Sequence, residues 1–371
     1  MTVPEAFQVA LQHHQAGRLG EAEALYRQIL AVAPQHADAL HLMGLIGNQV
    51  GRNDIAVDLI RQAIAIAPGQ PAFHSNLGNA LSASGRLDEA IAAYRRAVQL
   101  QPDFADAHNN MGSALKTKGD LNGAIAAYQR ALACRPDYAE VHANLGSALC
   151  DRGRLEEAVA ACRRAVELRP EFAEGHNNLG IALSAQGKKD EAITTYARAL
   201  QIKPEAADFH ANLGNVLCEQ GRTEEAIAAY RRAIQFKPDF ASAHYNLGHA
   251  LNLQGRLDEA IAASLKAIQL RPEFAEALNN LGFALHGKGR FDEAIAAYRH
   301  AIAVAPERPA FHSNLGNVLR DKGRVEEAEA ASRRAIQLKP DYAQAHGNLG
   351  NALGDLGRVE EIGRASCRER V

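Results

Sequence analysis

Hydrophobic residues recur along the chain in short helical segments that glycine and proline separate. In residues 72–85, the apolar side chains of Phe73, Leu77 and Leu81 lie four positions apart, so they share one face of a helix. A glycine then follows, where a left-handed residue commonly ends a helix. Residues 86–100 place acids in the first turn and arginines later, which suits the helix dipole, and a proline soon stops the segment. The pattern therefore predicts a pair of helices joined by a short turn.

The same pattern returns with a period of 34 residues. When the glycine of the Asn-Leu-Gly motif is counted as position 8, repeats begin at residues 3, 37, 71, 105, 139, 173, 207, 241, 275, 309 and 343. One repeat cannot bury its own apolar face, so neighbouring repeats must stack. The sequence predicts two divergent repeats over 3–70, eight regular repeats over 71–342 and an eleventh, cut short, over 343–361.

The conserved positions within each repeat resemble the tetratricopeptide repeat family. They are Leu-Gly at positions 7 and 8, Ala at 20, often an aromatic residue at 24, Ala at 27 and Pro at 32. The resemblance covers nearly the whole chain and implies an all-α fold, a right-handed superhelix built as an α-solenoid of helix-turn-helix repeats. In that family the first helix of each repeat lines a concave inner surface. Two departures are a histidine where tryptophan is common at position 4, and Cys162, Ser264 and Ser332 at position 24.

An asparagine occupies position 6 in nine successive repeats, and we call this series the ladder. The residues four before and three after it, such as Ala72 and Asn79, share its helical face and are often small or polar, which predicts a solvated surface. An amide offers donors and an acceptor, so a row of amides can bind the backbone of an extended peptide. The alternative is that the amides satisfy polar groups of neighbouring helices. The predicted peptide-binding residues are Asn76, Asn110, Asn144, Asn178, Asn212, Asn246, Asn280, Asn314 and Asn348.

Further asparagines widen this row of amides at positions 5 and 9, and the whole set favours binding. The first functional prediction is a protein-protein interaction scaffold that holds an extended peptide in its concave groove. The second rests on resemblance, because the array is similar to the N-terminal arm of O-linked N-acetylglucosamine transferases. It predicts the substrate-recognition arm of such a glycosyltransferase, with the catalytic domain lying beyond this chain. Lysine is absent from positions 2 and 5 of the ladder repeats, which argues against a clamp for a peptide carboxylate.

Composition excludes several other partners. The formal net charge is -2, with both signs spread through the chain, so we expect no nucleic-acid partner. The 5 cysteines form no CxxC pair, which argues against zinc or a disulfide framework and suits a reducing compartment. No apolar stretch is long enough to span a membrane or act as a signal peptide. We expect a cytoplasmic chain with no membrane partner.

Catalytic and metal-binding motifs are missing from the sequence. No GxSxG, P-loop, HExxH or dinucleotide-binding motif occurs, so the chain as given is predicted not to be an enzyme and to need no cofactor. Histidines recur at position 4, but stacked helices lie about 8–10 Å apart, too far for two such side chains to share one metal ion. We expect these imidazoles to take the structural place of tryptophan between the two helices of a repeat.

The last ten residues break the pattern. Position 20 of the eleventh repeat should be alanine and is Ile362, after which the repeat vanishes into IGRASCRERV. This string matches one reading frame of a common sequencing adapter. The sequence therefore predicts that residues 362–371 are an artefact and that the natural protein continues.

Overall fold

The computed structural model describes residues 1–358, which form 21 α-helices and no strand. The predicted non-native segment 362–371 and the end of the eleventh repeat lie outside the described residues. The first helices of the repeats are α1 (Val3–Gln15), α3 (Ala37–Gln49), α5 (Pro71–Ala83), α7 (Ala105–Lys118), α9 (Ala139–Asp151), α11 (Ala173–Ala185), α13 (Ala207–Glu219), α15 (Ala241–Leu253), α17 (Ala275–Gly287), α19 (Pro309–Asp321) and α21 (Ala343–Asp355). The second helices are α2 (Leu19–Val32), α4 (Asn53–Ile66), α6 (Leu87–Leu100), α8 (Leu121–Cys134), α10 (Leu155–Leu168), α12 (Lys189–Ile202), α14 (Thr223–Phe236), α16 (Leu257–Leu270), α18 (Phe291–Val304) and α20 (Val325–Leu338). The predicted all-α solenoid of helix-turn-helix repeats is confirmed.

A glycine at position 15 makes the turn between the two helices of each repeat. Gly85 has φ of 74° and Gly119 has φ of 91°, and within the described part of the chain positive φ occurs only at glycines of this series. A side chain at such a residue is strained in this left-handed conformation. The turn therefore depends on glycine, as the sequence predicts.

Glycine at position 8 lets the two helices of a repeat approach closely. A Cβ atom added to Gly78 would lie 2.5 Å from the ring of Tyr94, and one added to Gly112 would lie 2.7 Å from the ring of Tyr128. Both tyrosines, at position 24, are almost fully buried. A tyrosine ring thus fills the space that the missing side chain leaves, and the pair locks the first helix onto the second.

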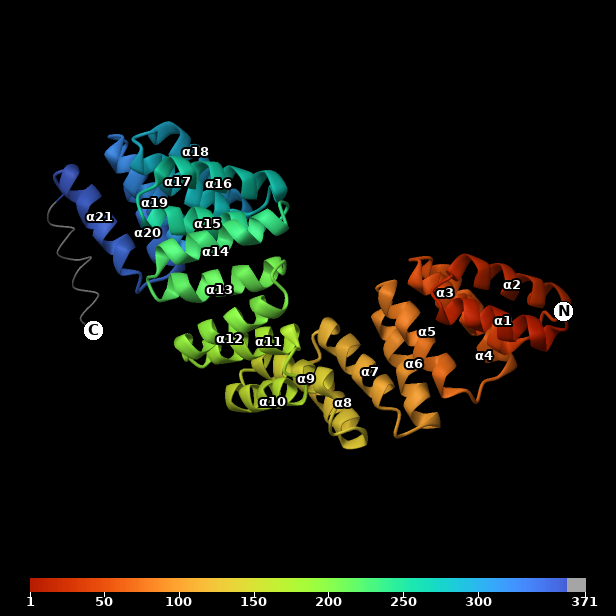
Figure 1. Cartoon of the computed structure of the whole chain (residues 1–371). Helices are drawn as coiled ribbons and strands as arrows, with labels where there is room; N and C mark the ends of the chain where they lie inside the picture. The colour runs from red at the N-terminus through yellow and green to blue at the C-terminus, as the bar shows by residue number, and fades with distance from the viewer. Residues whose placement is uncertain (359–371) are drawn as a thin grey trace. The chain divides into compact units, whose positions relative to one another are not determined.

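The structure separates into two compact units, Met1–Lys188 and Lys189–Val371, called here the N-terminal half and the C-terminal half. Figure 1 shows each half as a succession of antiparallel helix pairs, running from α1 to α11 and from α12 to α21. The boundary falls inside the repeat that begins at residue 173, between its two helices. The sequence gives no sign of this boundary, because the period of 34 residues continues through it.

Each half has its own hydrophobic core. In the N-terminal half one cluster gathers Tyr26, Ile29 and Ile46 with small alanines between them. In the C-terminal half a longer cluster runs through successive repeats and includes Leu251 and Leu285. Alanine recurs throughout both clusters because two helices can pack closely only where their facing side chains are small. The packing leaves one edge of every first helix outside the core, and that edge carries the ladder.

Candidate functional site

The nine ladder asparagines all lie on first helices, from Asn76 in α5 to Asn348 in α21. Eight of their side chains are half-buried, so each has one part packed against a neighbour and another part open to solvent. Asn280 in α17 differs, because only 7% of it is exposed. The ladder is therefore neither core nor fully solvated surface, and its hydrogen bonds decide what it can do.

In the N-terminal half the amides form a connected network that begins at α3. The amide Nδ2 of Asn76 donates to Nε2 of His41 at 2.9 Å, and Asn79 donates to Oδ1 of Asn76 at 3.3 Å. The Oδ1 atom of Asn79 then accepts two hydrogen bonds, from the hydroxyl of Tyr94 at 2.8 Å and from Nδ2 of Asn110 at 3.0 Å. This one amide joins the second helix of its repeat to the first helix of the next.

The network continues through α7, α9 and α11. Asn109 donates to Oδ1 of Asn110 at 3.2 Å, and Nδ2 of Asn144 donates to Oδ1 of Asn109 at 3.0 Å. One repeat later, Nδ2 of Asn178 donates to the backbone carbonyl of Ala143 at 3.3 Å. In each case a ladder amide uses an N–H group to hold the preceding first helix.

The C-terminal half repeats this arrangement around Asn215. The hydroxyl of Tyr230 and Nδ2 of Asn246 both donate to Oδ1 of Asn215, each at 2.9 Å, as Tyr94 and Asn110 do to Asn79. The position-6 amides thus join adjacent repeats in both halves. This supports the alternative that the amides satisfy polar groups of neighbouring helices. The half-buried amides still have other polar groups open to solvent.

Further along the C-terminal half the ladder amides still donate to the preceding repeat, but to different acceptor atoms. Nδ2 of Asn314 donates to Oδ1 of Asn279 at 2.9 Å, and Nδ2 of Asn348 donates to both the carbonyl and the hydroxyl of Ser313 at 3.0 Å. Both acceptors lie on position 5 of the preceding repeat. One N–H group of each amide is therefore occupied, and its plane is fixed.

A polar pocket lies on the ladder face of the N-terminal half. Its volume is about 530 Å³. Residues of three successive first helices and one tyrosine of α6 line it: Asn48, Asn79, Ser82, Ala83, Tyr94, Asn110 and Ser113. Its groups are amides and hydroxyls, which suit the donors and acceptors of a peptide backbone.

The second pocket lies on the ladder face of the C-terminal half, between α15 and α17. It has a volume of about 510 Å³ and its walls are largely aromatic. The residues that line it are Tyr245, His249, Asn252, Leu253, Asn279, Asn280 and Phe283. Asn280 is predicted from the sequence, whereas the aromatic walls are not. The signal was present, because Tyr245, Leu253 and Phe283 lie at positions 5, 13 and 9, which are small or polar in the other ladder repeats except for Ile181 at position 9.

The position-4 histidines have a shared structural contact. In eight repeats Nε2 donates to the carbonyl of the proline six residues earlier, at 2.7–2.9 Å, so that the imidazole joins each first helix to the end of the preceding repeat. The contact differs from the expected one, which placed the ring between the two helices of a single repeat. The histidines are His74, His108, His142, His176, His210, His244, His312 and His346.

Comparison with family models agrees with this geometry. A model described as TPR repeat matches residues 78–119, 112–150 and 146–187, and one described as Tetratricopeptide repeat matches residues 10–71. The chain belongs to the tetratricopeptide repeat family. A model described as Cilia and flagella-associated protein 70 C-terminal domain matches residues 172–366 of this chain.

Solved structures share the tetratricopeptide fold. The crystal structure of the APC/C hetero-tetramer Cut9-Hcn1 is 13% identical with a TM-score of 0.59, and the match covers 95% of this chain and 90% of that chain. The crystal structure of YrrB, described as a TPR protein with an unusual peptide-binding site, is 26% identical with a TM-score of 0.40, over 50% of this chain and 95% of that chain. No curated protein matches this tetratricopeptide repeat protein.

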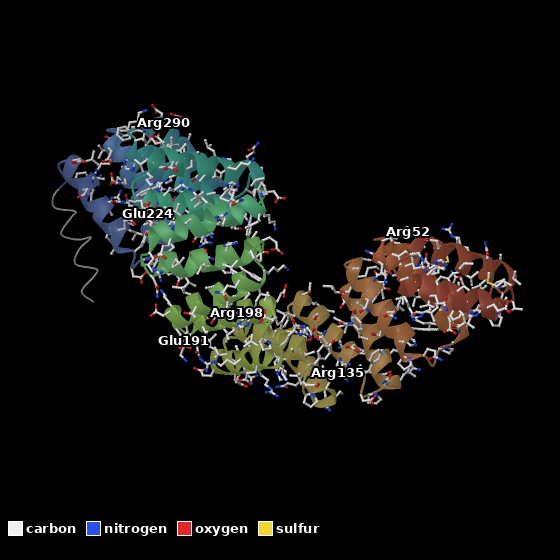
Figure 2. The ribbon with its side chains drawn as sticks, viewed as in Figure 1. Arg52, Arg135, Glu191, Arg198, Glu224 and Arg290 are labelled. Carbon is white, nitrogen blue, oxygen red and sulfur yellow. The ribbon has the colours of Figure 1, made fainter. Side chains whose placement is uncertain are left out.

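Charged side chains of this tetratricopeptide repeat protein pair along the outer face of the repeats. Arg52 and Arg135, both labelled in Figure 2, are exposed. Arg52 pairs with Glu23 of the preceding repeat at 2.8 Å, and Arg135 pairs with Asp106 of its own repeat at 3.3 Å. An arginine before the second helix also pairs with a glutamate three residues later in many repeats, as Arg290 does with Glu293. Exposed pairs of this kind contribute little stability, about 0–1 kcal/mol each.

The ladder network begins on a buried histidine. His41 in α3 is 7% exposed, and its ring stacks on Phe73 with centroids 4.2 Å apart. Burial lowers the pKa of His41 to about 4, and the nearby carboxylate of Asp38 opposes this shift only in part. The imidazole is therefore neutral at pH near 7, with Nε2 unprotonated and able to accept from Asn76.

The cysteines within the described residues are unpaired: Cys134, Cys150, Cys162 and Cys218. Cys162 packs against Gly146, and burial raises the pKa of its thiol to about 12, so this thiol is unreactive at neutral pH. Among residues 1–358 no group of three or more histidine, cysteine or acidic side chains could hold a metal ion. No helix in the same range is long and apolar enough to cross a membrane.

Proposed function

We propose that this tetratricopeptide repeat protein is a protein-interaction scaffold that binds an extended peptide segment along the ladder face. The observation that supports this is a row of half-buried asparagine amides, one per repeat, next to a polar pocket of about 530 Å³. In seven of these residues an N–H group is already bonded to the preceding repeat. The amide is therefore held in one orientation, which lowers the entropy cost of binding.

The spacing of the ladder suits a peptide backbone. Neighbouring helices pack about 8–10 Å apart, and an extended chain rises about 3.3 Å per residue. Successive ladder amides therefore meet roughly every third residue of a bound peptide. Side chains of an extended peptide alternate with a period of two, so this spacing reads the backbone and not one set of side chains. Binding along the polar part of the ladder should be tolerant of sequence.

Selection from a phage library of random dodecapeptides tests the proposal. The full chain should enrich peptides, and synthetic copies of them should bind in fluorescence anisotropy. Changing Asn76, Asn110 and Asn144 together to alanine removes backbone hydrogen bonds of about 1 kcal/mol each, so affinity should fall by at least about tenfold. The matched control changes Arg95 and Arg96, on the outer face, to alanine and should leave affinity unchanged.

A second variant separates binding from stability, because the ladder amides also hold adjacent helices. Ala83 is exposed and lines the polar pocket, so Ala83→Arg fills that pocket without removing any ladder hydrogen bond. It should weaken peptide binding with little change in melting temperature. If the asparagine variant melts early while Ala83→Arg binds peptides like the wild type, the amides serve only to join helices and the proposal is wrong.

A narrower proposal follows from the resemblance of the array to the arm of O-linked N-acetylglucosamine transferases. In this form the bound segment is the acceptor protein of a glycosyltransferase, whose catalytic domain follows the array in the natural protein. Sequencing genomic DNA beyond codon 361 tests this directly. A nucleotide-sugar-binding domain in the same reading frame would support it, and an intergenic stop soon after that codon would rule it out.

A further inference from the structure

We propose that the pocket between α15 and α17 holds one tyrosine side chain of the bound peptide and so sets the register of that peptide on the ladder. The proposal rests on the proposed function, since it concerns the same face of the first helices. It adds a requirement for one particular side chain to a surface that otherwise contacts backbone. Walls, floor and charge of the pocket each limit what it can hold.

The walls of the pocket suit an aromatic ring. Phe283 is 51% exposed and Leu253 is 62% exposed, so both present apolar surface to the pocket mouth. Tyr245 stands opposite on α15 and is held by the ring of Phe274, with centroids 4.9 Å apart. Aromatic rings prefer to pack edge-to-face or offset against other rings at such distances. A flat ring inserted here would cover apolar surface that is otherwise in water.

The floor of the pocket has an unpaired donor and an unpaired acceptor. Nδ2 of Asn280 and Oδ1 of Asn252 are shielded from solvent and have no hydrogen-bond partner within the described part of the chain. Asn280 is 7% exposed, and Nδ2 of Asn252 donates to the backbone carbonyl of Asn280 at 3.0 Å, which orients the side chain of Asn252. A hydroxyl group both donates and accepts, so it can satisfy both atoms, whereas an indole N–H can only donate.

The pocket favours a neutral occupant, because no charged side chain is among the residues that line it. The charges of Glu276 and Arg308 act on Tyr245 in opposite directions, and these two side chains pair with each other at 3.1 Å. Burial also lowers the pKa of His249, which keeps that imidazole uncharged at neutral pH. A phosphorylated or cationic side chain would lose hydration here without gaining a counter-charge.

No other repeat supplies this combination. Position 9 is Asn or Ser in most of the ladder repeats and becomes His249 and Phe283 in these two neighbours. Position 13 is Leu253 here, while the other repeats have Ala, Gly, Thr, Gln or an acid. One such pocket in a row of similar amides would give a bound peptide a fixed starting point, because only one of its side chains could be buried there.

Small amides of single amino acids test the pocket without any peptide contact to the ladder. N-acetyl-tyrosinamide is titrated against the full chain, with binding followed by NMR of the ligand. It should bind, N-acetyl-phenylalaninamide should bind about tenfold more weakly for want of a hydroxyl, and N-acetyl-phosphotyrosinamide should not bind measurably. Equal binding of all three, or tightest binding of the glutamine derivative, would overturn the assignment.

Two variants locate the binding. Phe283→Ala should weaken N-acetyl-tyrosinamide binding by about tenfold, while Phe236→Ala, which removes a similarly exposed ring from α14, should have no effect. Asn280→Leu keeps a similar size and removes the unpaired donor, so the preference for tyrosine over phenylalanine should disappear. If Asn280→Leu keeps that preference, or if the two phenylalanine variants behave alike, the pocket does not bind tyrosine.

The random dodecapeptide library then separates the two proposals. Tyrosine at one fixed position of the enriched peptides, lost when Phe283→Ala is used as bait, supports both. Enriched peptides without any preferred aromatic residue would leave the scaffold function intact and remove the tyrosine pocket. Binding of N-acetyl-tyrosinamide with no peptide enrichment would keep the pocket and remove the extended-peptide scaffold.

Discussion

The ladder face around α5 and α7 and the ladder face around α15 and α17 use the same repeat positions for different chemistry. In the first, Asn79 at position 9 accepts hydrogen bonds from Tyr94 and Asn110, so every amide is tied to a neighbour. In the second, position 9 is His249 and the amide of Asn280 has an unpaired nitrogen beside an aromatic pocket. The same repeat positions can therefore hold amides that hydrogen-bond to one another or amides that have a group unpaired for a ligand.

Position 24 also differs between the repeat of α5 and α6 and the repeat of α15 and α16. A tyrosine there crosses the glycine of its own repeat, and its hydroxyl reaches position 9, as Tyr94 does to Asn79. In the repeat of α15 and α16 that residue is Ser264, which is fully buried and too short to reach the ladder face. In that repeat position 9 is His249.

Acidification should break the N-terminal network first, with the largest effect. His41 has a folded pKa of about 4 against an ordinary value of 6.5, so protons favour the unfolded state. Its contribution is complete above pH 6.5 and is lost as pH falls toward 4, by about 3 kcal/mol in all. His41→Gln keeps an acceptor for Asn76 without titrating in this range.

Thermal melting of wild type and His41→Gln at about pH 7 and about pH 4.5 measures this term apart from the acidic groups that both proteins share. At about pH 7 the wild type should melt at a higher temperature than His41→Gln. At about pH 4.5 this difference in melting temperature should become smaller or change sign. A gap that stays the same at both pH values would show that His41 is not held neutral in the folded chain.

Adding a methyl group at position 8 should destabilise the two regions by different amounts, because the glycine packs against different residues in each. Gly78→Ala places a Cβ 2.5 Å from the buried ring of Tyr94, whereas Gly248→Ala meets only the hydroxyl of Ser264, at 2.8 Å, which can rotate away. We expect Gly78→Ala to destabilise by about 2 kcal/mol. For Gly248→Ala we expect a change near zero, since the gain in helix propensity, about 1 kcal/mol, offsets the contact. Chemical denaturation measures both, and equal losses would contradict the packing difference.

Removing one hydroxyl should give the smallest effect. Tyr94→Phe keeps the ring and loses the hydrogen bond to Asn79, at a cost of about 1 kcal/mol. Tyr26 provides a matched control at the same repeat position, because its hydroxyl is buried with no partner within the described residues. Tyr26→Phe should therefore be neutral or slightly stabilising in the same denaturation experiment. A loss as large as that of Tyr94→Phe would mean that ring packing, and not the hydrogen bond, accounts for both.

Much of the fold follows from local rules that the sequence shows directly. The period of 34 residues, the left-handed glycine of each turn and the packing of Tyr94 on Gly78 all depend on residues within one repeat. The ladder positions also follow from the period. Their partners do not, because the direction in which an amide points depends on the side chains of the neighbouring repeat. Asn144 bonds Asn109, for example, while Asn178 bonds a backbone carbonyl.

The aromatic pocket and the boundary after Lys188 required the structure for a different reason. Phe283 and Leu253 belong to different repeats, and only stacking brings them to one pocket. The boundary falls where the repeat pattern is intact, so no change of composition marks it. Sequence patterns describe single repeats well and describe contacts between repeats poorly, because those contacts combine positions that vary independently.

The direction of the ladder hydrogen bonds has a consequence for how such an array can change in length. Seven ladder asparagines donate toward the preceding repeat, and His41 supplies the acceptor for the first of them. A duplicated repeat placed after an existing one finds its acceptor already present at position 5, position 9 or a backbone carbonyl. Gene duplication can therefore lengthen the array wherever the preceding repeat offers such an acceptor, which it does not do for Nδ2 of Asn280, whereas a new first repeat must bring its own acceptor, as His41 does here.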